Sequence, residues 1–236
     1  MIATIVNAIA IIIGGLLGTV FGNKINERFT TGIMTCMAMI TAIIGIQSAV
    51  GTSSILIVVI CCVLGTIIGT ALKLDERINS SGDKLKARLE KTGFAKGRFG
   101  DAFVTATLVF GVGTMAILGS IQAGLNQDYA ILFTKSVMDF VTALAFSAAM
   151  GSGVIFAAIP IFIFQGLITL LAGVAQPFLT KEVITEMSAA GGPVFIGMAV
   201  NMLELRKERV RIGDMIPSIF IPILYFPLAD WISSLL

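Results

Sequence analysis

The sequence has no histidine among its 236 residues. Histidine is the most common general base and a frequent zinc ligand, so its absence excludes Ser-His hydrolases and metalloproteases of the His-Glu-x-x-His type. The three cysteines lie within apolar segments without the spacing of a metal site, and we interpret them as packing residues. We therefore expect no enzymatic activity and no bound cofactor, and the residues assign no metal site.

Charged residues are also scarce. They make up 13% of the chain, against about 25% in soluble domains, while 56% of the residues are hydrophobic and the mean hydropathy is +0.98. The formal net charge of +2 is too small to indicate a nucleic acid partner. This composition predicts an all-α membrane protein whose main partner is the lipid bilayer.

The sequence contains several long apolar runs with few charged residues. A helix that crosses a hydrocarbon core of about 30 Å needs about twenty mostly apolar residues. Eight such runs predict eight transmembrane helices in one polytopic domain, residues 1–236. Their approximate spans are Ile2 to Gly22, Phe29 to Val50, Ser54 to Leu74, Asp101 to Leu125, Tyr129 to Met150, Gly153 to Val174, Val183 to Leu205 and Ile212 to Leu235.

The lysines and arginines test this count, because the cytoplasmic loops of membrane proteins collect positive charge. With the N-terminus outside, fourteen of the sixteen fall in the predicted inner segments, and only Lys135 and Lys181 do not. Seven helices would scatter these residues over both sides of the membrane. The charge distribution therefore predicts eight crossings with both termini outside.

The one long hydrophilic stretch, residues 75–100, lies in the cytoplasm in this topology. Within it, Leu85 and Leu89 are four residues apart among basic residues, which is typical of a short amphipathic helix lying on the inner leaflet. A plain solvated connector is the alternative, and the pattern does not separate the two.

Two pairs of short segments resemble each other. Residues 42–47 are similar to 116–122, and residues 17–22 are similar to 64–69, which indicates either internal repeats or chance similarity between glycine-rich helices. Both members of each pair run in the same direction across the membrane, so they do not by themselves indicate an inverted repeat.

The first apolar segment carries glycine at every fourth residue, at Gly14, Gly18 and Gly22. This spacing lets helix backbones approach closely where lipid supplies no hydrophobic driving force. We predict a packing seam along these glycines, either within the chain or between the subunits of a homo-oligomer.

The fifth segment combines two charges with two hydroxyls. Lys135, Ser136, Asp139 and Thr142 fall on one stripe of a helix, and Asp139 lies about 15 Å deep, near the midplane. A charged side chain there costs about 2.5 to 3.5 kcal/mol even on insertion scales, so this stripe is a hypothesis for a functional site. The alternative is a structural pair, one turn apart, in which Lys135 and Asp139 only neutralise each other.

Side-chain amides add polar groups to other apolar segments. Gln122, Gln165 and Asn201 lie in the fourth, sixth and seventh segments, with Gln47 in the second, and each requires a partner or water. They are either hydrogen-bonding links between helices or, if they converge on the Asp139 stripe, contacts for a polar solute.

Glycine and proline predict irregular backbone in three places. These are residues 151–153 with Pro160, residues 191–193 in the seventh segment, and the proline-rich last segment. We expect kinked or broken helices there. Breaks at membrane depth line substrate or ion sites in transporters, whereas a tight turn or proline kink is the simpler interpretation.

Three stretches together with the glycine-rich first segment resemble the bacterial membrane family called domain of unknown function 554. The stretches are Val112 to Gln122, Lys135 to Asp139, and Gln165-Gly166. The resemblance covers essentially the whole chain and implies a multi-pass protein of the bacterial plasma, or inner, membrane. It implies no activity, since none is established for the family.

These observations favour a transporter of a small polar solute or ion. Its site would consist of Asp139, Lys135, Ser136, Thr142, Gln122, Gln165 and Asn201, with Na⁺ or H⁺ as a coupling ion. The alternative is a non-transporting membrane scaffold or assembly partner, in which the glycine seams and the basic loop carry the function. An intramembrane enzyme is a third and weaker class.

Overall fold

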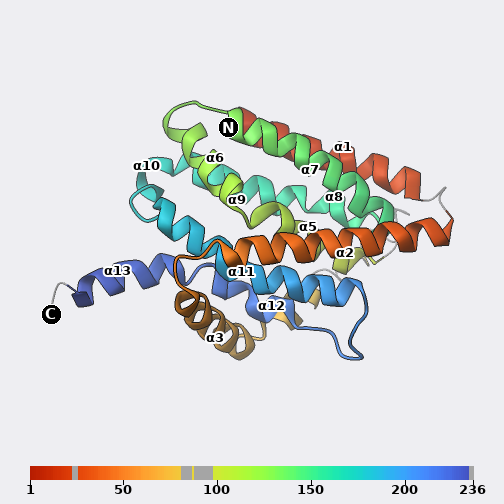
Figure 1. Cartoon of the computed structure of the whole chain (residues 1–236). Coiled ribbons are helices and arrows are strands. Elements are labelled where there is room, and N and C mark those ends of the chain that lie inside the picture. The colour runs from red at the N-terminus through yellow and green to blue at the C-terminus, as the bar shows by residue number, and fades with distance from the viewer. Residues whose placement is uncertain (23–25, 81–86, 88–97, 234–236) are drawn as a thin grey trace. The chain divides into compact units, whose positions relative to one another are not determined.

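The computed structural model of the chain describes residues 1–22, 26–80, 87 and 98–233, and within these ranges it contains helices and no strand, as expected for an all-α protein (Figure 1). The chain separates into two compact units, a division that the sequence did not reveal. The first unit contains Met1–Ile40 and Ile78–Gly173, and the second contains Thr41–Arg77 and Val174–Leu236. The long helices of both units are apolar enough in composition to cross a membrane.

The first unit is built around two long helices, α1 (Ile2–Gly22) and α7 (Ala130–Met150), which lie side by side (Figure 1). Helix α7 ends at Gly151, whose positive φ of 100° suits glycine at a helix C-terminus. This unit also contains α5 (Phe99–Gly111), α6 (Thr114–Leu125), α8 (Gly153–Phe156) and α9 (Ala158–Leu170), and the short α10 (Ala172–Ala175) crosses its boundary at Gly173.

The predicted glycine seam joins α1 to α7. A Cβ atom at Gly14, Gly18 or Gly22 would overlap the carbonyl oxygen of Phe140, Leu144 or Ala148, respectively. Because each of these oxygens belongs to the same chain, the seam lies within the chain. The prediction of a close backbone contact is therefore confirmed, and of its two forms the contact within the chain is the one observed.

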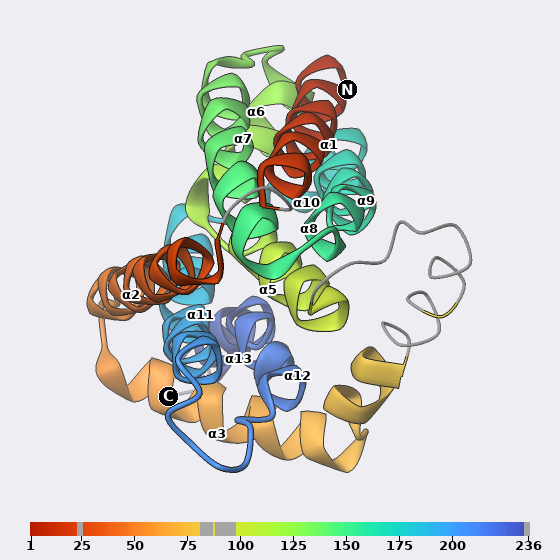
Figure 2. The ribbon, with the colours of Figure 1, turned by 90° about the vertical axis from the view of Figure 1, so that its right-hand side faces the viewer.

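The second unit packs α3 (Ile55–Ala71) along the segment that follows α11 (Lys181–Met202) (Figure 2). That segment consists of α12 (Ile212–Met215), the 3₁₀ helix η1 (Ile216–Ile219) and α13 (Pro222–Ser233), which confirms that the last apolar segment is irregular. Helix α2 (Glu27–Val50) begins in the first unit and ends in the second.

The seventh segment, predicted to be kinked or broken, shows no break, and one break in the fourth segment was missed. Helix α11 continues through Pro193, because membrane helices tolerate an internal proline when neighbouring groups satisfy the freed backbone. The fourth apolar segment is instead broken at Val112-Gly113, where α5 and α6 meet at 58°. Pro160 is the third residue of α9, where proline costs little because the first amides of a helix have no partner within it.

The described chain has five helices that are long and apolar enough to span a membrane, and up to seven if each bent pair counts as one span. The bent pairs are α5 with α6, and α3 with the helix Leu74–Ser80, which meet at 59°. The membrane-protein prediction therefore holds, but the count of eight does not follow, because the last segment forms only a shorter apolar helix region, Ile212–Leu228. The predicted amphipathic helix around Leu85 and Leu89 falls outside the described residues.

Candidate functional site

The Lys135–Asp139 ion pair is the centre of the candidate site. The ammonium Nζ donates to the carboxylate Oδ2 at 2.5 Å, and the two side chains are each 8% exposed. They lie one helical turn apart on the inner face of α7, whose opposite face exposes Val137 and Met138. The predicted stripe is thus turned inward, and its two charges are paired.

The pair lies beside the broken helix. The ammonium of Lys135 is 5.9 Å from the centre of the Phe110 ring, which is within cation–π range. Phe110 belongs to the last turn of α5, just before the break at Val112-Gly113. The ends of α5 and α6 leave carbonyl and amide groups without helical partners there, so this part of the unit combines free backbone polarity with a buried charge pair.

A second polar pair connects α1 and α9 to this centre. The Asn7 amide donates to Gln165 Oε1 at 3.2 Å, and both side chains have an exposed fraction of 0%. The Asn7 side chain also lies close enough to the carboxylate of Asp139 to interact with it. Asn7 therefore joins three helices. Gln165 was among the predicted site residues, whereas Asn7 was missed.

Several polar atoms near this network lack a partner among the described residues. They are the hydroxyls of Thr4 and Thr169, the amide oxygen of Asn7 and the amide nitrogen of Gln165. Burying a polar group without a hydrogen bond costs about 1 to 3 kcal/mol in proteins, so these atoms require a partner such as water or a solute.

The remaining predicted residues occupy different positions. Ser136 is buried next to Lys135, and its hydroxyl donates to the Leu132 carbonyl at 2.7 Å, while Thr142 and Gln122 are half-buried on α7 and α6. Asn201 lies in the second unit, where its amide donates to the Val210 carbonyl at 2.9 Å and accepts from the Val210 N–H at 2.8 Å. Its side chain thus holds the loop after α11. The structure pairs Lys135 with Asp139 and places Gln165, through its partner Asn7, close to this pair.

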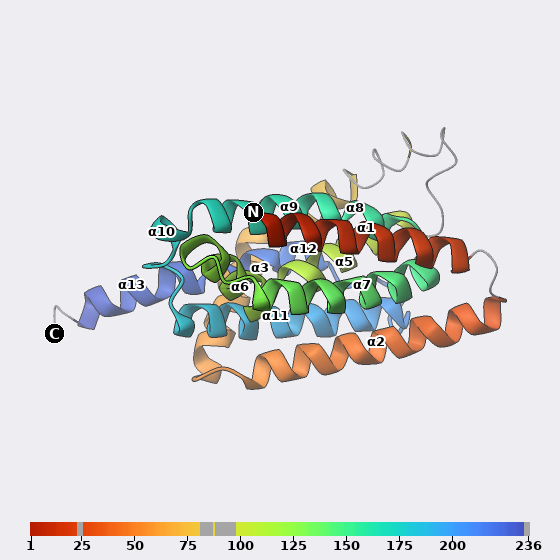
Figure 3. The ribbon, with the colours of Figure 1, turned by 90° about the horizontal axis from the view of Figure 1, so that it is seen from above.

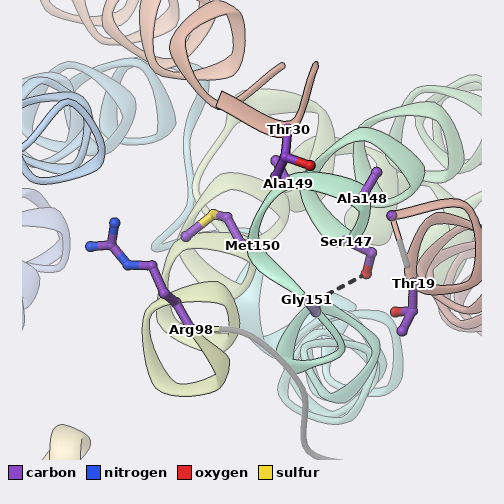
Figure 4. A pocket seen from close by; sticks show the side chains of 9 residues that line it. Thr19, Thr30, Arg98, Ser147, Ala148, Ala149, Met150 and Gly151 are labelled. Atoms are coloured by element: carbon purple, nitrogen blue, oxygen red, sulfur yellow. Dashed lines mark hydrogen bonds between the residues drawn. The ribbon is translucent and has the colours of Figure 1, made fainter. Parts of the chain in front are cut away.

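A small pocket of about 220 Å³ lies at the other end of α1 and α7. Figure 4 shows Thr19, Thr30 and Ser147 around it, with the Ser147 hydroxyl donating to the Gly151 carbonyl at 3.3 Å. Arg98 also lines the pocket, and its guanidinium is 3.0 Å from the Asp101 carboxylate. Ser147 lies about 12 Å along α7 from Asp139, so the pocket and the ion pair share one helix.

Glu186 is a buried acidic residue that the sequence interpretation overlooked. It is 1% exposed on α11, in the second unit. Oε2 accepts from the Thr52 hydroxyl at 2.6 Å, and Oε1 accepts from the backbone N–H and the hydroxyl of Ser53, each at 2.7 Å. Both oxygens are thus satisfied by the loop that precedes α3. An acidic residue inside an apolar run was the available signal.

We predict that Glu186→Leu lowers the free energy of unfolding by about 1 to 3 kcal/mol, because the donors of Thr52 and Ser53 lose their acceptor. Glu186→Gln should cost less, since its amide oxygen still accepts. Glu182→Leu is the matched control, on an exposed position of the same helix. Chemical unfolding in detergent measures the difference, and equal losses for Glu186→Leu and Glu182→Leu would contradict a role for these hydrogen bonds.

The chain is similar to proteins of no established function. Residues 2–226 match the model of the family described as "Protein of unknown function (DUF554)". The "Uncharacterized membrane protein YdfK" of Bacillus subtilis is 26% identical over 226 residues, with 94% of each chain covered. The "Uncharacterized protein YqgA" of Escherichia coli is 25% identical over 223 residues, again with 94% of each covered. No solved structure matches. The chain belongs to the family of unknown function 554, as its sequence motifs indicated.

Proposed function

We propose that this protein carries a small polar solute or an ion across the bacterial plasma membrane, with the Lys135–Asp139 pair at the centre of its path. The observation that carries the proposal is a buried ion pair on a long apolar helix, with an amide from a second helix close to its carboxylate. Ionisable residues within membrane helices are costly and typically mark ion or substrate pathways. The neighbouring break between α5 and α6 supports this assignment, because broken helices line such sites in transporters.

Lys135 acts in this proposal as an internal counter-ion. It occupies the Asp139 carboxylate while the site is empty, so that the carboxylate stays charged without ligand. A cation, or a cationic group of the solute, then competes with Lys135 for Asp139. Ser136, Thr142, Gln122 and Gln165 supply hydrogen bonds to the solute, whereas Asn201 remains bound to its own loop. No catalytic step and no cofactor is part of this mechanism.

The proposal includes the topology of eight crossings with both termini outside. In that arrangement the bent pair α5–α6 is the fourth crossing, and the short helices from α12 to α13 form the last one. The distribution of lysine and arginine supports it.

Cysteine labelling tests this topology in a variant without Cys36, Cys61 and Cys62. A cysteine at Asn126, which is exposed after α6, should react with an impermeant thiol reagent in intact cells. A cysteine at Ser80, which is exposed at the end of the helix after α3, should react only in opened cells. The reverse result would invert the topology, and labelling of both sites in intact cells would exclude the predicted odd number of crossings between them.

Transport itself is tested with a panel of compounds, so the substrate need not be chosen in advance. Purified protein is screened for thermal stabilisation by small polar solutes and ions at several pH values, and the compounds that stabilise it are then tested for uptake in proteoliposomes. We expect at least one compound to stabilise the wild type and to be taken up. Stabilisation and uptake that persist after both charges of the Lys135–Asp139 pair are removed would contradict the assigned site.

A further inference from the structure

The seam between α1 and α9 contains more polar side chains than its packing requires. Figures 2 and 3 show α1 between α7 and α9. Asn7 contacts Gln165, and Gly15 lies against Ile155 just before α9, so the two helices run antiparallel. Thr4 precedes Asn7 by three residues and Thr169 follows Gln165 by four. Both hydroxyls therefore lie about one turn from the amide pair, on the side of the N-terminus.

The four side chains share three properties. They are uncharged, they are all less than one-tenth exposed, and each has a polar atom without a partner in the described structure. The Asn7 amide nitrogen already has a partner, since it donates to Gln165. The atoms left over are two hydroxyls, one amide acceptor and one amide donor, and a file of water molecules can satisfy each of these.

We propose that Thr4, Asn7, Gln165 and Thr169 form a hydrated path that delivers protons to Asp139 from the N-terminal end of α1. This inference rests on the proposed function and identifies its coupling ion as H⁺. A proton that enters the path as hydronium passes along its water molecules to the Asp139 carboxylate, which becomes a neutral carboxylic acid and leaves only water in the path. Lys135 keeps its own proton and loses its ionic partner, so the site gains one positive charge and one free ammonium.

Sodium fits the same residues poorly. The unpartnered oxygens of the path are only those of Thr4, Asn7 and Thr169, and none of them is charged. The Asp139 carboxylate is occupied by an ammonium at 2.5 Å, so a metal ion would have to displace Lys135 and find its other ligands elsewhere. A proton needs only a connected file of donors and acceptors.

Among α7 and the described helices that pack against it, Lys135 is the charged side chain that faces Asp139. Helices α1, α6, α8 and α9 contain no Asp, Glu, Lys or Arg, and α5 contains only Asp101, in its first turn and paired with Arg98. A pH response of the centre is therefore assigned to Asp139 and its lysine.

Infrared spectroscopy after a pH jump tests the path without any transported solute. The wild type should develop a carboxylic acid band on acidification, and Asp139→Asn should lack it. Thr4→Val/Thr169→Val should slow the appearance of this band about tenfold or more, because each lost hydroxyl breaks the file of hydrogen bonds. Thr4→Ser/Thr169→Ser should restore the wild-type rate. Thr134→Val, at an exposed hydroxyl of α7, is the matched control and should change nothing.

Each other outcome overturns the inference. These outcomes are an unchanged rate in the valine variant, equal slowing in Thr134→Val, or no acid band assigned to Asp139. The thermal stability of the valine variant gives a second measurement. If Thr4→Val/Thr169→Val does not fold, the two single valine variants are measured instead. In a dry seam valine removes an unpaired hydroxyl and stabilises the protein, whereas in a hydrated seam it does not. If the wild type shows no transport but the acid band appears at the expected rates, the proposed function fails and the proton path stands. The failure of the function is therefore distinguishable from the failure of the path.

Discussion

Removing one charge of the Lys135–Asp139 pair is expected to destabilise the protein far more than removing both. In Lys135→Met or Asp139→Leu, the remaining charged group stays buried without its partner, which costs about 3 to 5 kcal/mol. The double variant Lys135→Met/Asp139→Leu replaces the pair by apolar side chains of similar size. Such replacements are often neutral or stabilising, so we expect its stability to be within about 1 kcal/mol of the wild type or above it.

The effects of these variants on function should not follow their effects on stability. The double variant is expected to fold and to lose ligand binding and uptake, because the proposed path requires both charges. Asp139→Asn keeps the size of the side chain and one acceptor oxygen, so it should be the best folded of the single variants, yet lose the response to pH or ions. A structural pair predicts instead that the double variant retains full activity.

Three measurements on the same set of variants separate these interpretations. Chemical unfolding in detergent gives the stability, thermal shift gives the binding of a stabilising solute, and proteoliposome uptake gives transport. Thr134→Val serves as a control on α7, since its hydroxyl is exposed and bonds only its own helix. A folded double variant with wild-type binding would falsify the site, and single variants as stable as the double would show that the charges are not buried.

The sequence predicted the parts of the site that lie on one helix. Lys135, Ser136 and Asp139 share a face because helical periodicity dictates it, and the burial of two opposite charges requires that they pair. The glycine spacing of α1 likewise predicts a close contact. Each of these features depends on residues within two or three turns of one another, which is the range over which sequence patterns are informative.

Contacts between distant segments were beyond that range. Asn7 contacts a residue 158 positions away, and the first apolar segment has no charge that would mark one of its faces. Glu186 is satisfied by a loop more than 130 residues earlier, although an acidic residue in an apolar run was itself a signal. The position of the backbone break at Val112-Gly113 also depends on contacts between distant segments. Glycine predicts flexibility, but the packing of α5 and α6 against other helices determines which glycine is used.

The glycine seam provides a second prediction with a large effect. Gly18→Leu is expected to prevent α1 from packing against α7, because a Cβ at this position already overlaps the Leu144 carbonyl oxygen and lies 2.8 Å from the Ser147 Cβ. Added methylene groups in a packed interior cost about 1 to 3 kcal/mol, so we expect Gly18→Ala to fall in this range and Gly18→Leu to exceed it. Gly14→Ala should behave like Gly18→Ala, since it meets the same helix one turn earlier.

Gly32 is the matched control, because it lies in helix α2 and a Cβ added there would have no neighbour within 4 Å. Gly32→Ala and Gly32→Leu should leave stability unchanged or raise it by up to about 1 kcal/mol, the helix propensity that glycine lacks. Thermal and chemical unfolding in detergent compare the two positions. Since α1 also holds Asn7 against Asp139, Gly18→Leu should weaken ligand binding together with stability, whereas Gly32→Leu should weaken neither. Wild-type stability of Gly18→Leu would mean that α1 does not contact α7 through this glycine.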